Sequence, residues 1–168
     1  MGRLSARPLA LAAALLVAAC GFEPVYAPSG PAEALSGQVQ VGVINGTPGF
    51  AMRERLVDRL GRAEAARYML DVQLGFDQQG VAITTKDVTS RFDVTGTAVW
   101  TLTPLGADRP ALSGEERATT GYSAPTSNTS SAYAILSAQR AAEQRLAVLL
   151  ADRIARRVAL AAPPAPAP

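Results

Sequence analysis

The sequence predicts an α+β domain, a two-layer sandwich in which two helices cover one face of a roughly four-stranded, mostly antiparallel sheet. Two observations carry this prediction. Residues 68–76 and 92–102 alternate apolar and polar side chains with a period of two, which is typical of strands with one buried face. Residues 47–60 and 132–160 instead repeat apolar residues at helical spacing. The order strand, helix, three strands, helix favours helices gathered on one side of the sheet.

Four segments are expected to form the strands. The first lies at 39–43, where valine alternates with polar or small residues, and it can pair in parallel with a neighbour because a helix follows it. Between the second and third strands, Gln79-Gly80 suggests a hairpin turn. The turn sequence Thr-Pro-Leu-Gly at 103–106 closes the third strand, and a weaker fourth strand is expected from 112 to about 122.

Two segments are expected to form the helices. Thr47 can cap the first helix, with Pro48 in its first turn and Gly61 at its end. Arginines near the end of the second, longer helix suit the helix dipole. The second helix could lie on a membrane surface instead, but its stripe is well suited to covering the sheet. That stripe comprises Ile135, Ala142, Leu146, Leu149, Leu150, Ile154 and Val158.

Residues 1–19 are typical of a lipoprotein signal peptide. Arg3 and Arg7 precede an uncharged apolar run at 9–19, which is shorter than the ~20 residues of a spanning helix. The run ends in Leu-Val-Ala-Ala before Cys20, which resembles the bacterial lipobox. That resemblance implies cleavage before Cys20 and lipid attachment to its thiol. Cys20 is the only cysteine, so it has no disulfide partner within the chain; an ordinary signal peptide with an incidental cysteine is the alternative.

The remaining chain divides into three parts. Residues 20–37 are expected to form the lipidated N-terminus and a tether, because they are rich in Pro, Gly, Ala and Ser. Residues 161–168 repeat Ala and Pro and are expected to form a disordered tail. The folded domain is therefore expected at 38–160. A triacylated Cys20 would hold this domain at a membrane without a spanning helix.

Composition and spacing argue against several classes of function. The chain has no histidine, which excludes histidine-based catalytic triads and histidine-ligated metals. Neighbouring Glu115 and Glu116 should point to opposite faces of a strand, so they cannot easily form a carboxylate pair. The full chain has 16 basic and 14 acidic residues, and loss of Arg3 and Arg7 would balance them. Nucleic-acid binding thereby loses its electrostatic support, and we expect no enzyme, cofactor or metal site.

The start of the mature chain and the order of its segments resemble one family. Residues 20–26 read Cys-Gly-Phe-x-Pro-x-Tyr, and the second strand opens with Tyr-Met-Leu-Asp-Val-Gln-Leu at 68–74. Arg-Phe-Asp-Val-Thr follows at 91–95, and Ala-Ala-Glu-Gln-Arg-Leu lies in the long helix at 141–146. This combination resembles the LPS-assembly lipoprotein family, LptE, of the alphaproteobacterial type, over residues 20–160.

The resemblance implies a structural, non-enzymatic role. Members of the family plug the outer-membrane β-barrel LptD and help deliver lipopolysaccharide to the outer leaflet. Gly21 after the lipidated cysteine favours the outer membrane by analogy, with the domain on the periplasmic side. Lipopolysaccharide carries phosphates, so Lys86 and Arg91 are candidate contacts. The alternative is a lipid-carrier or transporter-auxiliary lipoprotein, which would enclose an apolar pocket.

Overall fold

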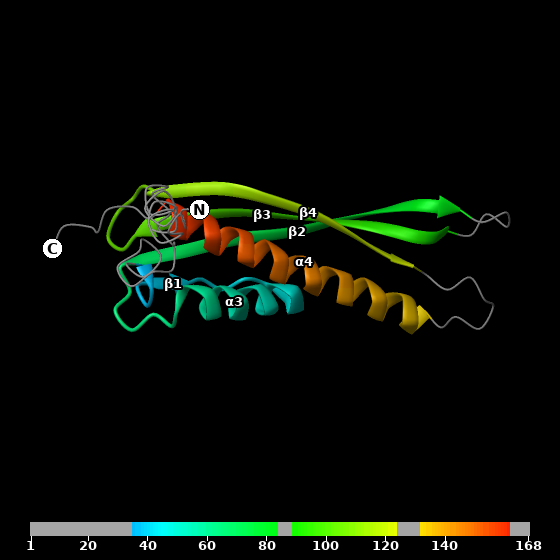
Figure 1. Ribbon diagram of the computed structural model, residues 1–168, viewed down its shortest axis with the longest axis horizontal. Coiled ribbons are helices and arrows are strands. Elements are labelled where there is room, and N and C mark those ends of the chain that lie inside the picture. Colours follow the sequence, from blue (N-terminus) through cyan, green and yellow to red (C-terminus); the bar gives the residue numbers. More distant parts are fainter. Residues whose placement is uncertain (1–34, 84–88, 124–131, 162–168) are drawn as a thin grey trace, which may run out of the picture.

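The computed structural model describes residues 35–83, 89–123 and 132–161, and these form two layers (Figure 1). One layer is a sheet whose spatial order follows the chain: β1 (Val39–Val41), β2 (Tyr68–Ile83), β3 (Thr89–Pro104) and β4 (Leu112–Ser123). The other layer holds the helices α3 (Gly46–Leu60) and α4 (Ala132–Leu160). This arrangement confirms the predicted α+β sandwich with both helices on one face of the sheet.

The sheet combines one parallel pair with two antiparallel pairs. β1 pairs with β2 in parallel, as predicted, because α3 returns the chain to the same end of the sheet. β2 and β3 form a long hairpin that is paired from Tyr68↔Pro104 to Ile83↔Thr89. Figure 1 shows that β1 and α3 lie beside one half of this hairpin only. The far half of β2 and β3 therefore extends past both elements.

The prediction of a turn at Gln79-Gly80 is wrong. Both residues lie inside the ladder, where Gln79 pairs with Asp93 and Gly80 with Phe92. A Gln-Gly pair forms a turn only where the flanking strands stop pairing, and here the ladder continues beyond it with a register shift between Gly80 and Ala82. The connection between β2 and β3 lies at 84–88, outside the described residues.

The passage from β1 to α3 also differs from expectation. Val43, expected on the first strand, follows β1 and is 86% exposed, because the chain leaves the sheet there to reach α3. Asn45, rather than Thr47, is the N-cap residue, and its side chain makes no capping hydrogen bond. Gly46 has a φ of 81°, which lets the chain enter the helix earlier than expected. Gly61 ends α3 as predicted, with a φ of 80°.

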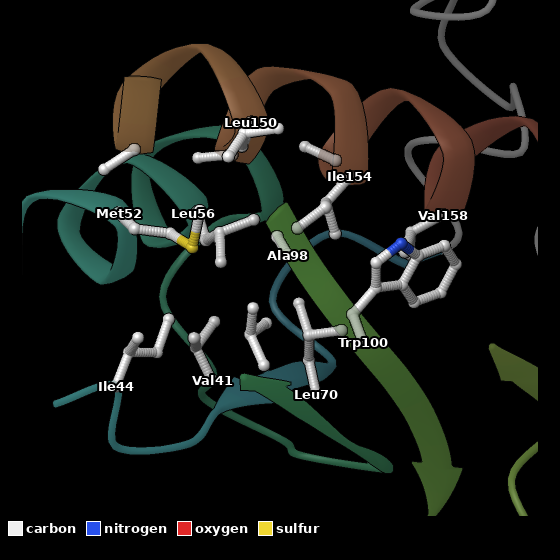
Figure 2. Close-up of a cluster of buried hydrophobic side chains, with 14 of the residues drawn as sticks. Val41, Ile44, Met52, Leu56, Leu70, Ala98, Trp100, Leu150, Ile154 and Val158 are labelled. Atoms are coloured by element: carbon white, nitrogen blue, oxygen red, sulfur yellow. The ribbon is translucent and has the colours of Figure 1, made fainter. Parts of the chain in front are cut away.

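The apolar sides of the two layers meet in one core. Gly96 on β3 allows α4 to approach closely, because a Cβ at that position would lie 3.1 Å from Leu150 Cδ1. Shape matching at this distance makes the core sensitive to added or removed methyl groups. Figure 2 shows the central side chains gathered between helices and strands: Val41, Ile44, Met52, Leu56, Leu70, Ala98, Trp100, Leu150, Ile154 and Val158.

α4 packs its apolar side against the sheet, which contradicts the alternative of a membrane-surface helix. Neither helix of the described residues is long and apolar enough to cross a membrane. The prediction that Leu149 belongs to the buried stripe is wrong, since it is 42% exposed. Successive residues of an α-helix are about 100° apart around its axis, which places Leu149 just outside one side of the buried arc of α4. The opposite side of that arc consists of alanines. The buried residues are Ala142, Leu146, Ala147, Leu150, Ala151, Ile154, Ala155, Val158 and Ala159.

Three charged side chains fasten α3 to α4. Arg55 donates from Nε and Nη2 to the two carboxylate oxygens of Asp152, at 2.9 and 3.1 Å, and Arg59 donates from Nε at 2.7 Å. Partial burial acts to raise the pKa of Asp152, but the hydrogen bonds and charges of both arginines outweigh it and hold that pKa below its usual value. The hydrogen bond to Asp152 in turn raises the pKa of Arg55.

Arginines near the end of α4 contact the sheet, in addition to interacting favourably with the helix dipole. Arg153 donates from Nη1 to the backbone carbonyl of Arg117 on β4, at 2.6 Å. Arg157 forms an ion pair with Glu116, the two groups being 2.8 Å apart. Glu116 is only 9% exposed, so the arginine compensates a carboxylate that would otherwise be buried alone. Both contacts tie the last turns of α4 to β4.

The burial of α4 predicts a sharp contrast between two adjacent leucines. Leu150→Ala should lower the free energy of unfolding by about 2–5 kcal/mol, because Leu150 is fully buried in the core. Leu149→Ala should change it by about 0.5 kcal/mol or less, because that side chain is half in solvent. Urea unfolding of the two variants measures both values. Equal losses would show that α4 is rotated about its axis.

The carboxylate that links the helices predicts a specific acid sensitivity. The pKa of Asp152 is lowered in the folded state, so its stabilisation is present above its unfolded-state pKa and is lost as pH falls through the folded-state value. Asp152→Asn should therefore be less stable than the parent near neutral pH. The gap in unfolding free energy should close as pH falls below the ordinary range of an aspartate pKa. A gap that stayed constant over this fall in pH in urea unfolding would contradict the ion cluster.

Candidate functional site

The sheet face that points away from both helices is polar along its whole length. Strand alternation produces this face, since each apolar residue directed at the core is followed by a residue directed outward. Its members are exposed or half-buried, and Val99, 45% exposed, is an apolar exception. The polar members include Gln73, Asp77, Thr95, Thr97, Thr101, Thr103, Glu115, Arg117 and Thr119.

Hydroxyl groups and exposed charged side chains dominate the chemistry of this face. The side-chain oxygens of Thr95 and Thr119, which are paired across β3 and β4, lie 3.0 Å apart in a hydrogen bond. Arg117 Nη2 donates to Glu115 Oε1 at 3.0 Å, in an exposed pair along one strand. Exposed pairs of this kind add little stability, so these groups are free to exchange their bonds for those of a partner surface. The face can therefore form hydrogen bonds with a partner over a wide area.

The structure describes only one of the three candidate residues from the sequence. Arg91 lies on β3, paired with Ala82 and Ser123, and it is exposed on the outer face of the sheet. Lys86 and Cys20 both lie outside the described residues. Arg91 is thus available to a ligand, while the roles expected of Lys86 and Cys20 stay predictions.

The two adjacent glutamates of β4 point to opposite faces, as predicted. Glu116 faces the helices and is paired with Arg157, whereas Glu115 lies on the outer face with a side chain 52% exposed. The sheet itself therefore separates the two carboxylates. They cannot share a proton or a substrate in the manner of a general acid/base pair.

The two edges of the sheet differ in a way that the sequence does not reveal. Tyr68 N donates to the carbonyl of Gln38, and Leu70 O accepts from Gly42 N, so the backbone N–H and C=O groups of even-numbered β2 residues point toward β1. Because these groups alternate in direction along each paired strand, the backbone groups of odd-numbered β4 residues point toward the open edge of β4. Arg153 covers part of that edge at Arg117. No described residue covers the β2 edge in this way beyond β1, because β1 ends after pairing with only the first part of β2.

Two surface hollows lie along the β1 and β2 edges. One, of ≈ 540 Å³, lies between β1 and α3, and its lining includes Arg53, Glu54, Asp58 and Arg62. The other, of ≈ 450 Å³, is lined by residues 43–45 and 71–74. The charges of the first make it a poor container for an acyl chain, because burial of charge against hydrocarbon is costly. The second is better suited to a polypeptide, since a strand edge forms one of its walls.

A model of the LptE family, described as lipopolysaccharide-assembly, matches residues 37–158. The chain belongs to the LptE family. The match spans the sheet and both helices, which are the elements that build the polar outer face. No match was found among curated proteins.

Solved structures share the fold of this LptE family member. A protein from Caulobacter crescentus is 22% identical with a TM-score of 0.58, over 77% of this chain and 93% of that chain. Rare lipoprotein B from Shewanella oneidensis is 14% identical with a TM-score of 0.52, over 73% and 94%. A minor lipoprotein from Acinetobacter baumannii is 11% identical with a TM-score of 0.56, over 79% and 97%. These likenesses support the fold of the described domain.

Family membership assigns the chain a role in lipopolysaccharide assembly. LptE proteins form a family of non-enzymatic lipoproteins of the cell envelope, which agrees with a site made of hydrogen-bonding groups on a rigid sheet. The α+β fold and the family expected from the sequence are both confirmed.

Proposed function

We propose that the protein is an outer-membrane lipoprotein that plugs an LptD-like β-barrel and supports lipopolysaccharide delivery to the outer leaflet. The observation that carries the proposal is the polar outer face of the sheet, presented by a domain of the LptE family. The lumen of a large barrel is polar, so a plug needs a rigid polar surface that can hydrogen-bond to it. The threonines of β3 and β4 supply such groups on a backbone fixed by two ladders.

The proposed membrane anchor is Cys20. Leu35 is buried in the core, so residues 21–34 would form the tether; extended at about 3.3 Å per residue, they would span about 46 Å and let the lipid sit in the bilayer while the domain enters the barrel from the periplasmic side. Several acyl chains on one terminus give stable attachment, since each buried methylene adds about 0.8 kcal/mol.

Lipid attachment at Cys20 predicts a defined mature N-terminus. Mass spectrometry of the membrane-extracted protein should find residues 1–19 removed and acyl groups on Cys20, because small residues precede this unique thiol. Cys20→Ala should leave the precursor uncut or release the protein from the membrane. Cleavage at another position, or an unmodified thiol, would refute the anchor.

Contact with lipopolysaccharide is proposed through basic side chains. Arg91 is exposed on the outer face of β3, and its guanidinium can bind a phosphate through two parallel hydrogen bonds. Lys86 would add a second cation close by in sequence. Arg91 forms no ion pair with another described residue, so a phosphate would not have to displace one in that part of the chain.

The barrel proposal predicts crosslinking from one face of the sheet only. Thr97→Cys, labelled with a benzophenone maleimide in outer membranes, should form an adduct with a large β-barrel protein on illumination, since Thr97 lies on the outer face. Val94→Cys is the matched control on the same strand, because its side chain is 1% exposed and faces the helices. Cys20 is the only native cysteine, so each label reports one introduced position.

Two outcomes would decide against the plug. No barrel adduct from Thr97, together with unchanged surface lipopolysaccharide after depletion of the protein, would overturn it. Purification of the isolated chain with stoichiometric bound lipid would favour the alternative, a periplasm-facing lipid carrier or transporter-auxiliary lipoprotein.

A further inference from the structure

The far half of β2 has an open edge that no described element pairs with. β1 pairs with β2 only as far as Leu70. Beyond it, the backbone N–H and C=O groups of Leu74, Phe76 and Gln78 point away from β3, because even-numbered residues of β2 face the β1 side. None of these three residues takes part in the backbone hydrogen bonds recorded between described residues outside the ladders.

This edge is unlike the other edge of the same sheet. Proteins usually protect sheet edges with charged side chains, bulges or covering elements, since a free edge recruits other chains. β4 follows this rule, because Arg153 binds the carbonyl of Arg117 on its open side. On β2, a register shift interrupts the ladder only after Gly80, at the far end. The stretch from Val72 to Gly80, about 30 Å long, is left able to pair.

The surroundings of this edge suit an extended polypeptide with one apolar face. The ≈ 450 Å³ hollow lies where residues 43–45 separate from β2, directly beside Val72 and Leu74. On the inner side of the edge, Leu74 and Phe76 are only partly buried, and Val43 is 86% exposed across the hollow. An added strand would cover these apolar groups with alternate side chains.

The outer side of the edge is acidic. Asp77 is exposed on the outer face of this stretch, whereas the place beside Asp71 is taken by Gly42, whose N–H donates to the carbonyl of Leu70. The neighbour of Asp77 across the ladder, Thr95, is neutral, and Asp77 forms no ion pair with another described residue. A basic residue on an added strand would complement it. A second copy paired through the same edge would instead place two acidic edges side by side, which is unfavourable.

We propose that the β2 edge from Val72 to Gly80 accepts an extended strand of another protein, with apolar residues toward the helix layer and lysine or arginine on the outer face. Backbone hydrogen bonds would supply affinity, and Asp77 would select a basic residue at the position opposite it. The strand would continue the sheet where β1 stops. This interaction uses the edge of the sheet and is independent of a barrel contact through its face.

A synthetic strand tests the proposal on the full chain in detergent. The probe is a blocked nine-residue peptide of alternating valine and threonine, with lysine in place of the two central threonines, so that one lysine lies opposite Asp77 in either strand direction; its control has glutamate there. The lysine peptide should bind at least about threefold more tightly, because an opposite-charge pair replaces a like-charge pair. Binding should also slow amide hydrogen exchange at Leu74, Phe76 and Gln78, which exchange rapidly in the free protein.

Two substitutions at one position isolate the backbone contact. Gln78→Pro removes an N–H that faces the open edge and leaves the ladder with β3 intact, whereas Gln78→Ala removes the same side chain and keeps that N–H. The proline variant should bind the lysine peptide about fivefold more weakly than the alanine variant. Asp77→Asn, which cannot disturb the backbone, should lower affinity for the lysine peptide and reduce its salt dependence.

Several results would overturn the proposal. These are absence of binding, equal affinity for the lysine and glutamate peptides, or equal affinity of the proline and alanine variants. A dimer of the full chain that Gln78→Pro dissociates would assign the edge to a second copy instead. None of these results alters crosslinking from Thr97, so failure of this proposal is distinct from failure of the barrel proposal.

Discussion

The close approach of α4 to the middle of the sheet is the constraint on which the rest of the molecule depends. The sheet has small residues at this place, Gly96, Ala98 and Ala118, and the side of α4 that packs against the sheet carries a line of alanines beside its leucines. A Cβ at position 96 would already lie 3.4 Å from Leu146 Cβ. With so little space, dispersion contacts are dense and α4 has one favourable rotation about its axis. Arg153 and Arg157 can then reach β4 from fixed positions.

That packing divides the sheet into two chemically different surfaces. The inner surface packs against the helices. Because side chains alternate between the two surfaces, the outer surface can carry threonine, aspartate and arginine without removing apolar side chains from the core. The outer surface is rigid because two long ladders fix it, and it is therefore suited to binding by shape and hydrogen bonding. Membership of the LptE family assigns this molecule a role in lipopolysaccharide assembly.

Periodicity predicted most of the fold because it reports burial directly. The strands at 68–76 and 92–102, the parallel first strand and the end of α3 at Gly61 all follow from local patterns. The pattern was wrong where tertiary context decides. Gln79-Gly80 is paired because β3 is long enough to reach it, and Leu149 is exposed because α4 rests on its alanine side.

The candidate surfaces were only partly predictable for the same reason. The polar face could be predicted, because it is the complement of the apolar alternation. The open edge of β2 could not, because it depends on β1 ending at Val41, and Val43 still fits the alternation. The cluster of Arg55, Arg59 and Asp152 joins residues more than ninety positions apart, and no local pattern marks such a contact.

The sequential order of the strands has a consequence for how the chain acquires its structure. β1 to β4 add one after another in the order of synthesis, so the sheet can grow from a local hairpin without waiting for distant segments. α4 follows all four strands along the chain, and among the described elements it provides the main cover for the inner side of β3 and β4. Until its 29 residues are complete, that apolar side is open to other chains. The nascent protein therefore needs shielding until α4 is complete, and truncation within α4 would leave the apolar side of the sheet exposed to other chains.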